Sequence, residues 1–140
     1  METIYNLINL YVLPFWALMI LAPHWGRTKR IMASFWPVAI LPAIYVALLA
    51  SQIINPPGMP LDFSLNGIAA FLGNPAGATV GWAHFLAFDL FVGRWVYLDS
   101  REQGVPAWIA SPILLFVLMA GPFGLLLYLI ARYTKNSVHR

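Results

Sequence analysis

Four stretches of apolar residues, each long enough to cross a lipid bilayer, constrain this chain more than any other feature of its sequence. They lie at about residues 3–22, 32–54, 79–98 and 106–132. About twenty apolar residues in a helix span the hydrocarbon core of a membrane. Hydrophobic residues make up 61% of the 140 residues and charged residues only 9%, which is far from the composition of a soluble domain. The sequence therefore predicts an all-α membrane protein, a single domain over residues 1–140 whose four transmembrane helices form an antiparallel bundle.

The segment between the second and third stretches has a different character. Residues 61–78 are too rich in Gly, Pro and polar residues for a confident fifth span, but they include SLNGIAAFLG. This sequence is compatible with a short interfacial or re-entrant helix. The first stretch is expected to be a retained span and not a signal peptide, because it lacks a basic start and runs into a basic turn.

Basic residues indicate how the chain is oriented in a membrane. Arg27, Lys29 and Arg30 predict that the loop at residues 23–31 is cytoplasmic. Four crossings then place the basic carboxyl-terminal tail, with Arg132 and Arg140, on the non-cytoplasmic side. This contradicts the rule that basic segments face the cytoplasm. A fifth crossing at residues 61–78 removes the conflict, but we prefer four. The net charge of +3 is explained by lipid contact and orientation at the span ends, so no nucleic-acid partner is expected.

Aromatic and charged residues near the expected span ends fit a membrane interface. The aromatic belt expected there comprises Trp25, Trp36, Trp82, Trp95, Trp108, Tyr128 and Tyr133. Just after the third span, Asp99, Arg101 and Glu102 are most simply interpreted as a solvated turn.

The third span carries ionisable residues within apolar sequence, namely His84, Asp89 and Arg94. Charges are costly in hydrocarbon, so such residues mark candidate functional sites. Asp89 is the most informative, because its short side chain cannot reach the membrane surface as that of Arg94 can. Asp89 must find a partner inside the protein or be protonated.

Helix geometry relates these residues in depth and direction. At 1.5 Å per residue, antiparallel helices form a polar layer at one depth, comprising Asn6, Asn9, Tyr45, Gln52 and His84. Near the midplane the same counting brings Asp89 close to Pro14 and to residues 120–122. Residues five apart on a helix point about 140° from one another, so the three ionisable side chains should find partners on other helices or in a ligand. Their helix faces carry Trp82 and Phe88 and suit a flat or polyene ligand as well as plain packing.

Three strings of residues resemble one known family. They are LPFWALMI at residues 13–20, WAHFLAFDLF at residues 82–91 followed by Arg94 and Trp95, and GPFGLL at residues 121–126. This pattern resembles the abscisic-acid-deficient type of small integral membrane proteins, a family named for a plant chloroplast protein required for neoxanthin synthesis. The resemblance covers nearly the whole chain. It implies a bacterial inner membrane or a photosynthetic or plastid membrane as the location.

The plant activity that the resemblance implies is isomerisation of a 5,6-epoxy carotenoid end group to an allenic alcohol, without net redox change. No cofactor is expected, and no protein metal site is apparent in the sequence. The reaction needs an acid at the epoxide oxygen and a base at the polyene. Asp89 and His84 are the candidates for these roles, and Arg94 is the candidate that steadies negative charge. The candidate ligand-binding residues are Asn6, Asn9, Trp16, Tyr45, Gln52, Trp82 and Phe88.

Each catalytic candidate also has a structural interpretation. Arg94 is able to extend toward the interface, His84 to pack there, and Asp89 to hydrogen-bond a neighbouring helix. The alternative function is therefore a non-catalytic membrane subunit that binds a carotenoid, a chlorophyll-type pigment, a lipid, a second copy or another membrane protein. His84 would then serve as an axial ligand to the pigment's magnesium or as a donor to a carotenoid oxygen.

Overall fold

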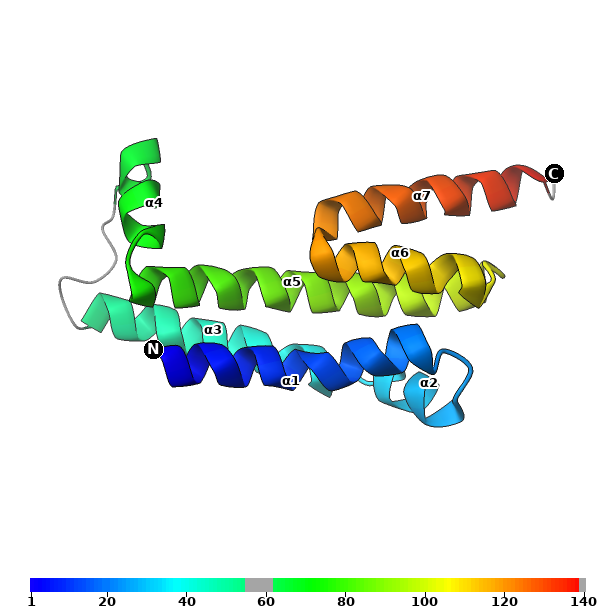
Figure 1. Cartoon of the computed structure of the whole chain (residues 1–140), viewed down its shortest axis with the longest axis horizontal. Helices are drawn as coiled ribbons and strands as arrows, with labels where there is room; N and C mark the ends of the chain where they lie inside the picture. Colours follow the sequence, from blue (N-terminus) through cyan, green and yellow to red (C-terminus); the bar gives the residue numbers. More distant parts are fainter. Residues whose placement is uncertain (55–61, 139–140) are drawn as a thin grey trace. The chain divides into compact units, whose positions relative to one another are not determined.

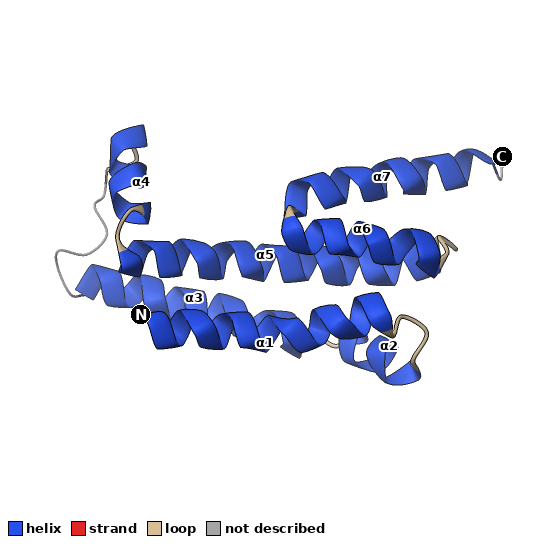
Figure 2. Ribbon diagram, in the orientation of Figure 1, coloured by secondary structure: helices blue, strands red, loops and turns tan. Residues whose placement is uncertain are grey.

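The computed structural model describes residues 1–54 and 62–138, and every regular element in these two ranges is a helix (Figures 1 and 2). The helices are α1 (Glu2–Leu21), α2 (Gly26–Ala33), α3 (Trp36–Ile54), α4 (Leu65–Leu72), α5 (Pro75–Glu102), α6 (Ala107–Met119) and α7 (Gly121–Val138). The expected break at residues 55–58 and the basic residue Arg140 lie outside the described ranges. The all-α prediction is confirmed.

Three of the helices are long and apolar enough to cross a membrane. They are α1, α3 and α5, with 20, 19 and 28 residues. The expected spans at residues 3–22, 32–54 and 79–98 thus correspond to helices, although α3 begins later and α5 is longer at both ends than expected. The four-span bundle stays a prediction.

The chain forms two compact units. The first contains Met1–Tyr11 and Val38–Ala87, and therefore the start of α1, most of α3, all of α4 and the first part of α5. The second contains Val12–Pro37 and the chain from Phe88 onward, and therefore the end of α1, the rest of α5, and α2, α6 and α7. Each unit has its own buried apolar side chains, including Leu41 and Val80 in the first and Met19 and Leu114 in the second.

The basic segment expected to be a loop at residues 23–31 is partly helical. Helix α2 is amphipathic: Thr28 and Met32, four residues apart, are fully buried, whereas Arg27, Lys29 and Arg30 are exposed. The Thr28 hydroxyl donates a hydrogen bond to the carbonyl oxygen of Ala22 at 2.9 Å. A loop assignment from charge alone missed this helix, because its buried face has only two residues.

Helix α4 lies in the segment at residues 61–78, where a short helix was expected. Ser64 is its N-cap, and the Ser64 hydroxyl accepts a hydrogen bond from the backbone N–H of Gly67 at 3.1 Å. The Ser64 backbone N–H donates to Asp62 Oδ1 at 2.9 Å, and this hydrogen bond lowers the pKa of the Asp62 carboxyl. The helical part of the expectation is confirmed.

The expected fourth span at residues 106–132 is two helices and not one. Helix α6 ends at Met119, and its C-cap Ala120 has a φ of −155° and a ψ of 75°, which are not helical; α7 starts at Gly121. Pro122 is tolerated there because the first turn of a helix needs no backbone donor at that position. The chain reverses direction between the two helices. A Cβ atom on Gly124 would overlap the backbone nitrogen of Val117, so α6 and α7 pack closely there. Figure 1 shows α6 and α7 side by side as a hairpin.

Helix α6 is too short to cross a bilayer by itself. The 13 residues of α6 extend about 20 Å, against a hydrocarbon core of about 30 Å. Helix α7 returns to the α5–α6 turn, where Lys135 Cε lies 4.0 Å from the position of a Cβ atom on Gly104. The end of α7 therefore lies at the same end of the second unit as the end of α5.

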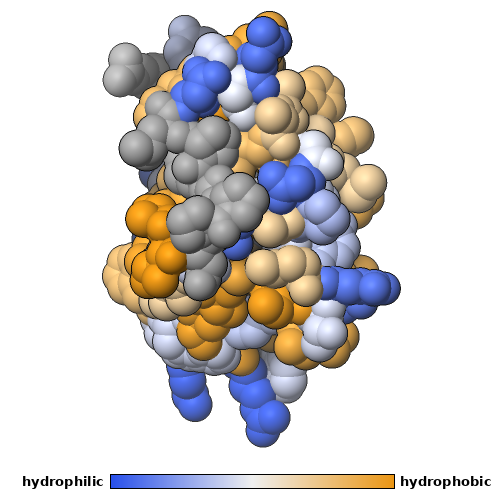
Figure 3. All heavy atoms as spheres, turned by 90° about the vertical axis from the view of Figure 1, so that its left-hand side faces the viewer, coloured by the Kyte–Doolittle hydropathy of each residue, from blue (hydrophilic) through white to orange (hydrophobic). Residues whose placement is uncertain are grey.

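Much of the surface is apolar, as lipid contact requires. Figure 3 shows hydrophobic residues over a large part of the face it presents. Of the expected aromatic belt, five residues are exposed: Trp25, Trp36, Trp82, Trp108 and Tyr133. Tyr128 is not part of a belt, because its side chain is 0% exposed and packs edge-on against Trp95 with ring centroids 5.3 Å apart.

Close packing within the hairpin gives a stability prediction. A Gly124→Ala substitution places a methyl group against Val117, so we expect unfolding to become easier by about 1–3 kcal/mol. Thermal unfolding in detergent, followed by circular dichroism, measures the change. The matched control is Gly26→Ala, since nothing lies within 4 Å of a Cβ at Gly26. Equal melting temperatures for the two variants would contradict the hairpin.

Labelling of single cysteines tests the topology, because the chain has no cysteine. We expect Gly26→Cys and Glu102→Cys, at exposed positions of the second unit, to react from the cytoplasmic side of a membrane. Phe63→Cys, which is 73% exposed, is expected to react from the other side. Thr28 is unsuitable because it is buried. Labelling of Gly26→Cys and Glu102→Cys from opposite sides would rule out this arrangement.

Candidate functional site

Asp89 packs against the turn of the α6–α7 hairpin. A Cβ atom on Gly121 would overlap Asp89 Oδ1, so only a glycine leaves room for the carboxyl group there. Asp89 is at the middle of α5, 14 residues after its first residue, Pro75. Figure 1 shows the α6–α7 turn beside the central part of α5. The prediction that Asp89 lies close to residues 120–122 is thus confirmed.

The Asp89 carboxyl has no hydrogen bond or ion pair with any residue in the described ranges, and it is half-buried. One turn further along α5, Gly93 lies beneath the ring of Trp16, which is buried. The Trp16 Nε1–H is likewise without a partner among residues 1–54 and 62–138. Buried polar groups normally have hydrogen-bond partners. In the described residues, Trp16 Nε1 is the one fully buried side-chain polar atom without a partner, and the half-buried Asp89 carboxyl lies on the neighbouring helix of the same unit.

Arg94 is bound by the protein itself. Its side chain is only 8% exposed, and it donates from Nε to the Ser34 carbonyl at 3.2 Å and from Nη2 to the Ala33 carbonyl at 3.1 Å. Its guanidinium lies 4.3 Å from the centre of the Phe35 ring. Arg94 thus holds the break between α2 and α3, where helical carbonyls lack partners. This environment favours a structural role over the catalytic role that was predicted, and also over extension to the interface.

His84 belongs to an aromatic cluster in the first unit. Its ring centre lies 5.4 Å from that of Tyr45 and 6.1 Å from that of Phe85. His84 and Phe85 are exposed side chains of α5, and Tyr45 is half-buried on α3. His84 and Tyr45, which were expected at one depth, are thus in ring contact.

A hydrogen bond within the first unit joins α1 and α5. Trp82 Nε1 donates to Asn9 Oδ1 at 2.9 Å, and the rings of Tyr5 and Trp82 are 5.8 Å apart. Asn9 Nδ2 also donates to the Tyr5 carbonyl at 2.9 Å. Of the remaining predicted ligand-binding residues, Asn6 and Phe88 are exposed, and Gln52 Nε2 lies 3.4 Å from Ser51 Oγ. The expected polar layer therefore contains two contacts, Asn9 with Trp82 and Tyr45 with His84.

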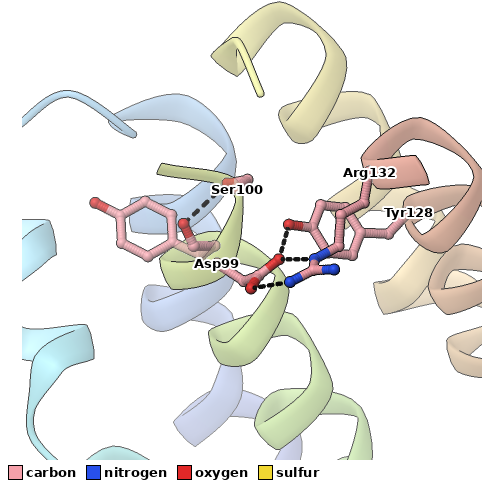
Figure 4. A network of polar contacts seen from close by, with 5 residues as sticks. Asp99, Ser100, Tyr128 and Arg132 are labelled. Carbon is pink, nitrogen blue, oxygen red and sulfur yellow. Dashed lines mark hydrogen bonds and ion pairs between the residues drawn. The ribbon is translucent and has the colours of Figure 1, made fainter. Parts of the chain in front are cut away.

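The interpretation of Asp99 as part of a solvated turn is wrong. Asp99 is buried in α5, accepts a hydrogen bond from the Tyr128 hydroxyl at 2.5 Å and forms an ion pair with Arg132 Nε at 2.8 Å (Figure 4). Tyr128 and Arg132 are four residues apart on α7 and so share a helix face. That spacing is visible in the sequence, but a partner for it could not be chosen while residues 106–132 were expected to form one straight span.

These features define a class: a small all-helical protein with membrane-length helices, whose longest helix carries a half-buried carboxyl group that has no partner among the described residues. The sequence matches the ABA DEFICIENT 4-like family over residues 3–128, and the chain belongs to this family. The predicted family resemblance is confirmed.

A curated relative matches over most of the chain. Protein ABA DEFICIENT 4, chloroplastic, of Arabidopsis thaliana is 32% identical over 137 residues, which cover 92% of this chain. The chain spans 60% of the length of that relative. No solved structure matches.

Proposed function

We propose that this protein acts in carotenoid metabolism within a photosynthetic or plastid-type membrane, where it rearranges the epoxide-bearing end group of a xanthophyll without net redox change. Membership of the ABA DEFICIENT 4-like family and similarity to a chloroplast protein support the pathway and the location. The membrane-length helices support an apolar substrate that is dissolved in the bilayer.

The observation that carries a catalytic role is the position of Asp89. It is a carboxyl group in the middle of a membrane-length helix, beside the α6–α7 turn and without a partner in the described part of the chain. An ionised carboxylate without a cation is costly in hydrocarbon, which favours the neutral acid. A neutral carboxylic acid supplies the proton that epoxide opening needs.

The proposed step is balanced by a single proton cycle. Asp89 donates its proton to the epoxide oxygen while the carbon–oxygen bond on the polyene side breaks, and the oxygen becomes a hydroxyl group. The same carboxylate then accepts a proton from the adjacent polyene carbon, whose electrons form the new double bond. Asp89 returns to its protonated state and the product is an isomer of the substrate.

Trp16 is proposed to orient the end group. Its buried Nε1–H has no partner among the described residues, and an oxygen of the end group is a suitable acceptor.

Expression in a host that accumulates an epoxy-carotenoid tests this function. We expect the extracted pigments to contain an allenic isomer of unchanged mass, which chromatography and mass spectrometry distinguish from the substrate. Release of a stoichiometric, unaltered pigment from purified protein, without conversion in the host, would favour the alternative of a pigment-binding subunit. The exposed ring of His84 beside Tyr45 is the feature that would support such a subunit. Neither conversion nor bound pigment would overturn both proposals.

A further inference from the structure

A cavity of about 400 Å³ lies within the second unit, at the end where α5 meets the α5–α6 turn. Its lining residues come from α1, α2, α5 and α6, from Pro23 and His24 before α2, and from the α5–α6 turn. Its polar lining residues are His24, Lys29, Tyr97, Ser100, Arg101 and Ser111. Its apolar lining includes Met19, Val105, Ala110 and Leu114. A volume of this size accommodates the polar head and first carbon atoms of an amphiphile.

The fixed charges that line the cavity, those of Lys29 and Arg101, are both positive. Three of its lining residues, His24, Lys29 and Arg101, are basic and none is acidic. Two carboxylates lie close to Arg101 in the sequence. Asp99 already binds Arg132 and Tyr128, and Glu102 is exposed and is not among the lining residues. Within residues 1–54 and 62–138, neither Lys29 nor Arg101 forms an ion pair.

The basic groups differ in how they are held. Arg101 donates from Nη1 to the Pro23 carbonyl at 2.5 Å and lies 5.5 Å from the centre of the Tyr97 ring, so its charge is fixed at the cavity. Lys29 has an exposed side chain, and no hydrogen bond to it is found in the described residues. A long flexible ammonium beside a fixed guanidinium suits a phosphate group, which takes hydrogen bonds from both.

The first turn of α6 adds a smaller contribution. Its N-cap is Pro106, which offers no side-chain acceptor, and Pro106 and Ala107 both line the cavity. The positive end of the helix dipole therefore adds to the charge of Lys29 and Arg101.

We infer that this cavity binds the phosphate headgroup of an anionic membrane lipid, with Lys29 and Arg101 at the phosphate and the apolar lining around the first carbon atoms. The position supports a lipid source, because the ends of membrane-length helices lie at the depth of lipid headgroups. This inference concerns a different part of the second unit from Asp89 and does not depend on the carotenoid proposal.

Native mass spectrometry of the full chain in detergent tests the inference. Phosphatidylglycerol is offered together with an equal amount of diacylglycerol carrying the same acyl chains. We expect phosphatidylglycerol to be retained preferentially, and Lys29→Gln to weaken its retention about tenfold through loss of a charge-assisted hydrogen bond. The matched control is Arg30→Gln, which removes an exposed charge from the neighbouring position of α2, outside the cavity.

A second variant tests the volume of the cavity separately from its charge. Ala110→Leu keeps every charge and fills part of the cavity, and it should also reduce retention, provided that circular dichroism shows unchanged helix content. Inorganic phosphate is the remaining probe. Displacement of the lipid by millimolar phosphate would assign the site to free phosphate and overturn the lipid source. Equal retention of diacylglycerol, or equal losses in Lys29→Gln and Arg30→Gln, would overturn the site itself.

Discussion

Replacement of Asp89 by Asn is expected to lower conversion of the epoxy-carotenoid by about a hundredfold or more, because Asn has the size of Asp but no titratable proton. Accumulation of the protein in the membrane should be unchanged, since the variant keeps the packing of Asp89 against Gly121. The measurement is the ratio of allenic product to substrate in pigment extracts, normalised to the amount of protein.

The matched control for this prediction is Asp62→Asn, which makes the same chemical change at an exposed position outside the membrane-length helices. It should convert substrate as the unaltered chain does. Asp89→Leu should lose both conversion and stability, because a bulkier side chain has no room over Gly121. Normal conversion by Asp89→Asn would exclude proton transfer by Asp89 and leave a packing role as the explanation.

The location of Asp89 could be predicted from the sequence because helix geometry is regular. A rise of 1.5 Å per residue fixes relative depth along antiparallel helices, and counting placed Asp89 beside residues 120–122. The contact between Asp89 and Gly121 holds even though residues 106–132 form a hairpin, since the turn of the hairpin comes at the same position in the sequence. The same counting brought His84 to Tyr45.

The hairpin itself could not be predicted from apolar character. Both α6 and the first part of α7 consist of residues that suit a continuous span, and a Gly-Pro pair is compatible with a kink as well as with a reversal. The decisive feature is Gly124, whose missing side chain lets α7 approach the backbone of Val117. Such an approach depends on tertiary packing, and the only feature of the sequence that reflects it is a glycine.

The wrong interpretation of Asp99 and the unexpected environment of Arg94 have a common physical origin. Asp99 was assigned to a solvated turn, and Arg94 either to catalysis or to extension toward the interface, which is the usual outcome for an isolated charge. Here short helices supply partners inside the second unit: Arg94 finds the carbonyls at the end of α2, and Asp99 finds the side chains of α7. Neither α2 nor the α6–α7 hairpin was expected, so these partners could not be foreseen.

The contact between Asp99 and α7 leads to the second prediction of large effect. Asp99→Ala leaves the fully buried Tyr128 hydroxyl without its acceptor and Arg132 without its carboxylate. We expect the free energy of unfolding to fall by about 2–3 kcal/mol, because buried donors that lose their acceptor retain their desolvation cost. Denaturant titration in mixed detergent micelles measures this loss.

Two further variants show whether the loss belongs to the network. Tyr128→Phe removes one hydrogen bond and should cost about 1 kcal/mol, and Asp99→Ala combined with Tyr128→Phe should cost less than the sum of the single changes, since the two residues share one interaction. Glu102→Ala, which removes an exposed carboxylate three residues further along α5, should have little effect. Additive losses, or a loss in Glu102→Ala as large as that in Asp99→Ala, would show that Asp99 does not hold the α6–α7 hairpin against α5.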